Sequence, residues 1–127
     1  MEMINNLEPY TKSLLILCLF IALDFVSGLL KALSNGTYES SKMRKGLYHK
    51  IGELFAWGFC LACDITLPQF GIDLPFALVN AVTVYIVLME SGSIIENIGI
   101  MNPEIGKYLS GVFEKIRTKD GADDAER

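Results

Sequence analysis

The sequence is poor in the residues that catalytic and metal sites use. It has one histidine, His49, and three cysteines, and no second histidine or cysteine lies at ligand spacing from His49. Cys60 and Cys63 form a Cys-x-x-Cys pair, but their apolar run has neither the strand and helix of a thioredoxin nor the second pair of a zinc site. Ser27 has no nucleophile motif and no histidine base within reach. We therefore predict no metal, no cofactor and no enzymatic activity.

The chain also lacks an excess of positive charge. Its 11 Lys and Arg residues are outnumbered by 15 Asp and Glu residues, for a net charge of -4. No basic face or helix rises above this background, so nucleic acid is not an expected partner. A positively charged leader is missing too, because Glu2 and Glu8 precede Lys12. We expect the first apolar run to remain in the mature protein.

The sequence is rich in apolar residues, and they come in blocks. Hydrophobic residues make up 51% of the 127 residues, and the mean hydropathy is +0.36. Charged residues gather in a connector at 31–50 and at the C-terminal end. A soluble domain of this size would instead alternate apolar and polar residues along its helices. The pattern predicts one domain, residues 1–127, that is an all-α integral membrane protein.

Three blocks are long enough to be transmembrane helices. They cover 11–31, 51–67 and 74–95, and a helix needs roughly 20 residues to cross the hydrocarbon core. The second block is at the short end of the range and contains Glu53 and Asp64. A re-entrant or surface segment is therefore the alternative for that block.

The connector at 31–50 holds much of the positive charge. Its Ser-Asn-Gly sequence at 34–36 is a helix-stop signal. The serines at 40–41 precede a new helix that we expect to lie along the membrane surface before it turns into the bilayer. Because charge is costly to move across a bilayer, we expect four basic residues to determine the topology, namely Lys42, Arg44, Lys45 and Lys50.

The C-terminal part differs from the spans. Asn102 and Pro103 mark a break, and residues 103–117 predict an amphipathic helix. Its apolar stripe consists of Ile105, Tyr108, Leu109, Val112, Phe113 and Ile116. Residues 118–127 are mostly charged and include no apolar residue larger than alanine, so we predict a disordered tail there.

The orientation follows from the distribution of charge. With three spans, the connector and the C-terminus share one side of the membrane, and that side holds every Lys and Arg residue except Lys12. The positive-inside rule makes it the cytoplasm and places the N-terminus outside. A two-span chain without the middle block would put the two basic segments on opposite sides, which the charges disfavour.

Polar side chains inside the spans form two stripes. A charge at the bilayer centre costs about 2.5–3.5 kcal/mol on insertion scales, so these residues require an explanation. Helical spacing puts one stripe on a face of the first span, made of Asp24, Ser27, Gly28 and Lys31. The stripe on the third span is made of Glu90, Ser93 and Asn97.

We interpret these stripes, together with Asp64, as candidates for helix packing or for lining a pore. The stripes would then face each other, another copy of the chain, or water. The alternative is that the acidic residues are interfacial, because Asp24 and Glu90 lie towards the cytoplasmic ends of their spans. There they would reach the headgroups or pair with Lys31 or Lys50.

An ordered set of short motifs runs through nearly the whole chain, from about Leu14 to Leu109. The set comprises residues 24–32, Gly36, the serines at 40–41, Lys45-Gly46, Asp64, residues 90–97, Pro103 and Leu109. Each motif is weak alone, but the ordered set is specific. In these motifs the chain resembles the phage holins of the type shared with clostridial toxin-secretion holins.

The resemblance implies a multi-pass protein of the bacterial cytoplasmic membrane that is encoded by a phage or prophage. Such a protein accumulates harmlessly and then oligomerises at a set time into lesions. The lesions depolarise the membrane and let an endolysin reach the cell wall, and in some relatives they release large toxins. The implied partners are the lipid bilayer, further copies of the chain, an endolysin or exported toxin without necessary direct contact, and an antiholin.

Two other classes of function stay open. A small channel or transporter subunit would also carry polar stripes, although transporters usually show inverted repeats or broken helices around a midplane site. A non-lytic antiholin would be harmless alone and would delay lysis by a partner. Passage of ions without large molecules would favour the channel over the holin.

Overall fold

The computed structural model describes the backbone of residues 2–125 and the side chains of residues 7–118. In this part of the chain the regular structure is helical: α1 (Glu2–Ser34), α2 (Ser40–Thr66), the 3-10 turn η1 (Leu67–Phe70), α3 (Leu78–Met101) and α4 (Pro103–Ala125). Three helical segments are long and apolar enough to cross a membrane, namely Leu7–Ser34, Ser40–Phe70 and Leu78–Met101. The predicted all-α architecture with three spanning helices is confirmed.

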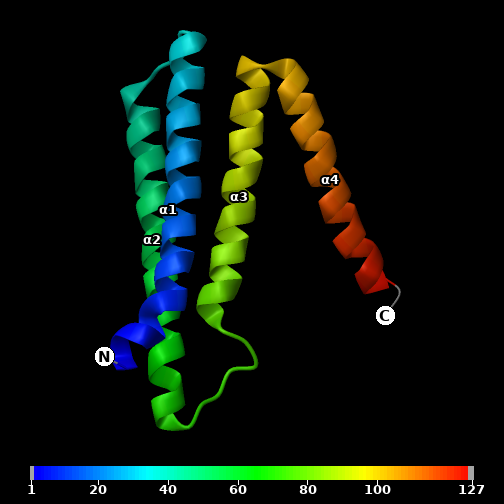
Figure 1. Cartoon of the computed structure of the whole chain (residues 1–127). Coiled ribbons are helices and arrows are strands. Elements are labelled where there is room, and N and C mark those ends of the chain that lie inside the picture. Colours follow the sequence, from blue (N-terminus) through cyan, green and yellow to red (C-terminus); the bar gives the residue numbers. More distant parts are fainter. Residues whose placement is uncertain (1, 126–127) are drawn as a thin grey trace.

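The three spanning helices lie side by side (Figure 1). α1 and α2 are antiparallel neighbours, and both pack against α3, with the largest contact between α1 and α3. The connector between α1 and α2 lies at the same end as the junction of α3 and α4, and we call this the connector end (Figure 1). The loop between η1 and α3 lies at the opposite end, which we call the loop end.

α1 begins earlier than the sequence predicts. The predicted span covered 11–31, whereas α1 already includes Pro9 in its interior. Proline removes an interior hydrogen bond and disfavours a straight helix, and the first turns of α1 bend away from the rest (Figure 1). The helix bends at Pro9 instead of ending there, because neighbouring residues such as Leu7 and Glu8 are good helix formers.

The helix-stop signal at 34–36 acts as predicted. Gly36 adopts a left-handed φ of 64°, which glycine tolerates because it has no Cβ. The Thr37 N–H donates to Ala32 O at 2.9 Å and the Gly36 N–H donates to Leu33 O at 3.4 Å. This pair of bonds is a Schellman motif that satisfies carbonyl groups at the end of α1.

α2 is one continuous helix from Ser40 to Thr66. The separate surface helix predicted in the connector is therefore wrong. No proline interrupts residues 40–66, so the intrahelical hydrogen bonds need not break before the apolar part begins. The basic residues consequently stand on the first turns of the spanning helix.

α3 begins at Leu78 and ends at Met101, whereas the predicted span covered 74–95. Residues 72–77 form a loop instead of the first helical turn, and Pro75 restricts the residue before it to extended backbone. The Asp64 carboxylate accepts hydrogen bonds from the backbone N–H groups of Leu78 and Val79 at 2.9 and 2.8 Å. This cap from α2 fixes the start of α3.

A small apolar core joins the three helices. It consists of Leu17 from α1, Trp57 from α2, and Val79 and Ile86 from α3. Most other large apolar side chains point outward, such as Phe55, which is 76% exposed. So much exposed apolar surface suits contact with lipid rather than with water.

α4 contacts α3 alone among the described elements. The two helices touch where Gly99 and Gly106 meet, since a Cβ on Gly106 would overlap the Gly99 Cα. Beyond this point α4 diverges (Figure 1), and its apolar Tyr108 and Ile116 stay exposed at 72% and 54%.

α4 continues to Ala125, so the predicted end at 117 and the predicted disorder of 118–125 are wrong. A single glycine and no proline lie in this segment, and lysine and alanine favour the helical backbone there. Residues 126 and 127 of the predicted tail lie outside the described part of the chain.

Candidate functional site

Three charged side chains meet inside the bundle, one from each spanning helix. Lys50 of α2 donates hydrogen bonds from its Nζ to Asp24 Oδ2 of α1 and to Glu90 Oε2 of α3. Asp24, Lys50 and Glu90 are only 9%, 8% and 3% exposed. We call this group the ion cluster. A buried charge is stable only when it is paired and hydrogen-bonded, and here each carboxylate contacts the same ammonium group.

The three residues meet because they lie at the same depth in their helices. Each is about ten residues from the connector end of its helix, or roughly 15 Å at the rise of an α-helix. The antiparallel order of α1, α2 and α3 brings these levels together. The sequence assigned Lys50 to the topology-determining group and offered it as one possible partner of Asp24 and Glu90, and the structure shows this pairing.

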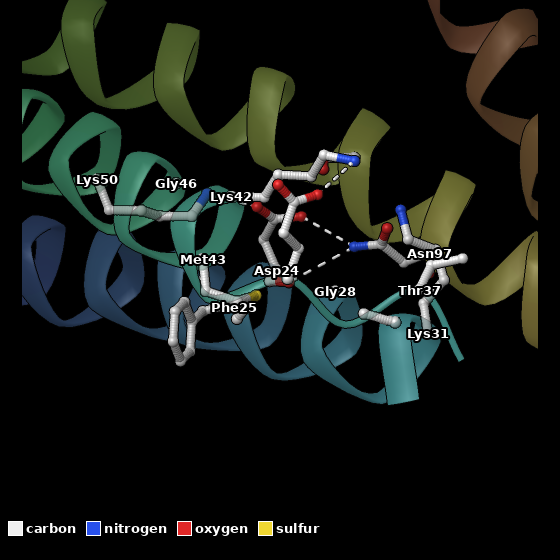
Figure 2. Close-up of a pocket in the computed structure, with 13 residues that line it drawn as sticks. Asp24, Phe25, Gly28, Lys31, Thr37, Lys42, Met43, Gly46, Lys50 and Asn97 are labelled. Carbon is white, nitrogen blue, oxygen red and sulfur yellow. Dashed lines mark hydrogen bonds and ion pairs between the residues drawn. The ribbon is translucent and has the colours of Figure 1, made fainter. Parts of the chain in front are cut away.

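Asn97 extends the ion cluster towards the connector end. Its Nδ2 donates to Asp24 Oδ1 at 3.2 Å and to Ser27 Oγ at 3.0 Å, and Figure 2 shows the amide directed at Asp24. The Ser27 hydroxyl donates in turn to the Asp24 backbone carbonyl at 3.1 Å. Gly28 faces the same amide, because a Cβ there would lie 3.5 Å from Asn97 Nδ2. The two polar stripes therefore face each other within one copy of the chain.

A cavity of about 380 Å³ opens beside the ion cluster, towards the connector end (Figure 2). Its walls come from α1, from the connector, from the first turns of α2 and from α3. Besides Asp24, the predicted site residues that line it are Gly28, Lys31, Lys42, Lys50, Ser93 and Asn97. The structure thus brings most of the predicted site residues together around one cavity.

Three of the predicted site residues lie away from both the cavity and the ion cluster. Asp64 is at the loop end, where it caps α3. Arg44 and Lys45 are exposed on the first turns of α2 and do not line the cavity. These two side chains are placed to meet water or lipid headgroups rather than the interior of the bundle.

Polar contacts also form around Thr83 and Glu53, and the sequence did not predict them. Trp57 Nε1 donates to Thr83 Oγ1 at 3.0 Å in the apolar core, and the Thr83 hydroxyl donates to Val79 O at 2.6 Å. The one sequence feature that could have indicated this contact is Thr83, whose hydroxyl lies within the apolar part of α3. Glu53 lies one turn beyond His49 on α2, with 3.3 Å between Glu53 Oε1 and His49 Nε2. Its other carboxylate oxygen is buried with no hydrogen-bond partner in the described part of the chain.

The side chains of this site interact through charges and hydrogen bonds. Among the described residues, no group of three or more His, Cys, Asp or Glu side chains is arranged to hold a metal ion. The ion cluster joins two carboxylates to one ammonium group, so it carries an excess negative charge when all three are ionised. Removing the ammonium group would leave two carboxylates without a counterion in a low-dielectric environment.

Comparison with known proteins agrees with this architecture. The model of the bacteriophage holin family matches residues 5–118, which include all three spanning helices and the ion cluster. No curated protein and no solved structure matches the chain. Because the family match covers nearly the whole sequence, the chain belongs to the bacteriophage holin family.

Proposed function

We propose that this chain is a holin that oligomerises in the bacterial cytoplasmic membrane and opens lesions in it. The lesions depolarise the membrane and release an endolysin to the cell wall, or a toxin to the medium. The bacteriophage holin family is not an enzyme family, and this function requires no catalysis. The endolysin or toxin passes through the lesion without necessarily contacting the chain, and an antiholin is a further partner that would delay opening.

The observation that carries the proposal is the ion cluster inside a chain of this family. A hydrated lesion needs polar side chains along its wall, whereas the outer surface of the bundle is largely apolar. The polar stripes supply such side chains, but in one copy Asp24, Ser27, Glu90 and Asn97 are turned inward and hydrogen-bonded within the bundle. We infer that assembly separates the helices enough to turn these stripes from each other towards water.

The proposed topology has the N-terminus outside and the C-terminus in the cytoplasm. Arg44 and Lys45 are exposed at the connector end, and Lys107 follows on α4, which begins at the same end (Figure 1). This arrangement satisfies the positive-inside rule. Labelling cysteines placed at each terminus with a membrane-impermeant reagent tests it, because both span number and orientation decide which terminus reacts.

Expression of the chain alone tests the proposed function. We expect the membrane potential to collapse and a large cytoplasmic reporter protein to leave the cell at the same time. Loss of potential with retention of the reporter would contradict the holin and favour a channel. No effect alone, together with delayed lysis when the chain is co-expressed with a lytic holin, would favour an antiholin.

Variants in the stripes test the role of the ion cluster in timing. We expect Asp24→Leu or Glu90→Leu to change the time of lysis more than Lys115→Gln does. The first two remove a partner of the buried Lys50, whereas Lys115 is exposed on α4. If the time of lysis is unchanged in both acidic variants, the stripes have no role in the mechanism.

A further inference from the structure

We propose that the cavity at the connector end binds the phosphate group of a phospholipid headgroup, with Lys31 and Lys42 as its cationic ligands. The cavity volume of about 380 Å³ is within the range of small-molecule sites. Asp24 and Lys50 of the ion cluster line it together with Asn97, and so do the two lysines (Figure 2). A single copy of the chain forms this site, so the proposal does not depend on lesion formation.

The two lysines are available to an anion, whereas Lys50 is not. Lys50 already contacts two carboxylates. Lys31 forms no ion pair with any residue that the structure describes. Lys42 pairs with Glu39 at 3.0 Å, but both side chains are more than half exposed, and exposed pairs of this kind contribute little. A phosphate could therefore share Lys42 with Glu39 at small cost.

The carboxylates of the cavity wall are already hydrogen-bonded, and only Glu39 shares a partner, Lys42, with the proposed anion. Asp24 Oδ2 accepts from Lys50 and Oδ1 accepts from Asn97. Glu39 accepts from the Ser41 hydroxyl at 2.8 Å. That bond and the Lys42 ammonium lower the pKa of the Glu39 carboxyl, so it stays ionised and paired. The positive charge of Lys31 is left without a partner inside the described structure.

Two hydroxyl groups complete the set of donors. Thr37 and Ser93 line the cavity, and neither side chain makes a hydrogen bond to another described residue. Phosphate oxygens accept hydrogen bonds from hydroxyl and ammonium groups alike, and bonds to a charged acceptor are the stronger kind. The cavity thus offers two cations and two free hydroxyls to a tetrahedral anion.

The depth of the cavity points to a lipid as the source of the phosphate. α2 carries Lys42, Arg44 and Lys45 in its first turns, and its apolar part begins at Ile51, immediately after Lys50. The cavity opens from the ion cluster towards this basic connector end, where a lipid headgroup would meet the bundle. Its wall also includes the apolar side chains of Phe25 and Met43, which suit the glycerol and acyl part of a phospholipid.

The test uses the full chain, purified in detergent and freed of lipid. A short-chain phosphatidylglycerol, inorganic phosphate and a short-chain diacylglycerol are titrated separately, and binding is measured by calorimetry. We expect the phosphatidylglycerol to bind more tightly than either other probe, because it alone combines the phosphate with the apolar part. Equal affinity for diacylglycerol, equal affinity for inorganic phosphate, or no binding of phosphatidylglycerol would overturn the assignment.

Matched variants separate the cavity from general attraction to a basic surface. Replacing Lys31 and Lys42 together by glutamine is expected to weaken phosphatidylglycerol binding by about tenfold or more. Replacing Arg44 and Lys45 together removes the same charge from the same end of the bundle and should leave binding nearly unchanged. Equal weakening by both pairs would contradict a defined site.

A steric variant tests the cavity without changing any charge. Gly46 lines the cavity, and a Cβ there would meet no atom within 4 Å. Gly46→Leu is therefore expected to fold, to retain its helical circular dichroism and to lose phosphatidylglycerol binding. Binding as tight as in the unmodified chain would show that the ligand does not enter this cavity.

Discussion

The two ends of the bundle are held together by different forces. At the connector end, α1, α2 and α3 meet through the ion cluster and the hydrogen bonds of Asn97. Towards the loop end they meet through Leu17, Trp57 and Val79, and the Asp64 carboxylate caps α3. The first end is charged and directional, whereas the second is mainly apolar.

This difference matters because lipid is as apolar as a leucine side chain. Apolar contacts between helices consequently have no hydrophobic driving force within a bilayer, and association depends on close packing and on polar bonds. The ion cluster therefore specifies which helices meet and at what depth. Water can also replace this contact, because hydration stabilises the separated charges.

The largest expected effect comes from removing the shared cation. Lys50→Met leaves Asp24 and Glu90 buried beside each other without a counterion, which costs about 3–5 kcal/mol in proteins where such pairs have been broken. We expect a fall of this order in the free energy of unfolding, measured in mixed micelles of mild detergent and SDS. Lys45→Met is the control and should change it by less than about 0.5 kcal/mol, because Lys45 is exposed.

A neutral version of the ion cluster sharpens this result. Combining Lys50→Met with Asp24→Asn and Glu90→Gln removes the unpaired charges along with the cation. We expect the triple variant to regain most of the lost stability, since neutral isosteres of a buried ion pair are often tolerated. If the triple variant is no more stable than Lys50→Met, uncompensated charge is not the reason for the loss.

Substitutions in the contact between α4 and α3, at the connector end, are expected to have the next largest effect. Gly106→Ala would place a Cβ in steric overlap with the Gly99 Cα, and overpacking of this kind costs about 1–3 kcal/mol. We expect the helices to separate, which spin labels on α3 and α4 would report as a longer distance. Gly111→Ala meets nothing within 4 Å and should leave that distance unchanged. The same distance in both variants would argue against the close glycine contact.

At the loop end, the cap on α3 is expected to have a smaller effect. Asp64→Ala removes the acceptor of the Leu78 and Val79 N–H groups, and losing a helix cap costs about 0.5–2 kcal/mol. Hydrogen exchange of these two amides should become faster, while exchange near the ion cluster stays the same. Asp73→Ala, in the exposed loop nearby, is the control. Slow exchange in the Asp64 variant would mean that α3 does not need this cap.

The smallest effect is expected in the apolar core. Trp57→Phe keeps an aromatic ring but loses the hydrogen bond to Thr83, which is worth about 0.5–1.5 kcal/mol. The Thr83 hydroxyl retains its bond to Val79 O, so no polar group is left unsatisfied there. A loss larger than that of Lys50→Met, in the same unfolding measurement, would reverse the proposed ranking of the two ends.

The sequence predicts the features of this fold that depend on local pattern. Three spanning helices follow from the apolar blocks, and the facing stripes follow from helical spacing, which puts Asp24 and Ser27 on one face and Glu90 and Asn97 on another. The stop at Gly36 follows from its need for a left-handed backbone. Each of these inferences uses residues within one helix or one turn.

The features that were missed depend on how separate helices meet. The sequence offered Lys50 only as one possible partner of the two acidic residues, and the antiparallel packing shows that it contacts Asp24 and Glu90 at once. The start of α3 at Leu78 depends on Asp64 from another helix. The cavity has the same origin, because its walls come from three helices and a connector.

The central claim is that the ion cluster is closed in the resting chain and separates when lesions open. Ser27→Cys tests it most directly, in a chain whose three native cysteines are replaced by alanine, because Ser27 is half-buried between α1 and α3 beside Asn97. We predict slow reaction of Cys at this position with a small membrane-permeant maleimide in cells before lysis, and fast reaction from the moment the membrane potential falls. Equal rates before and after that moment would contradict the account.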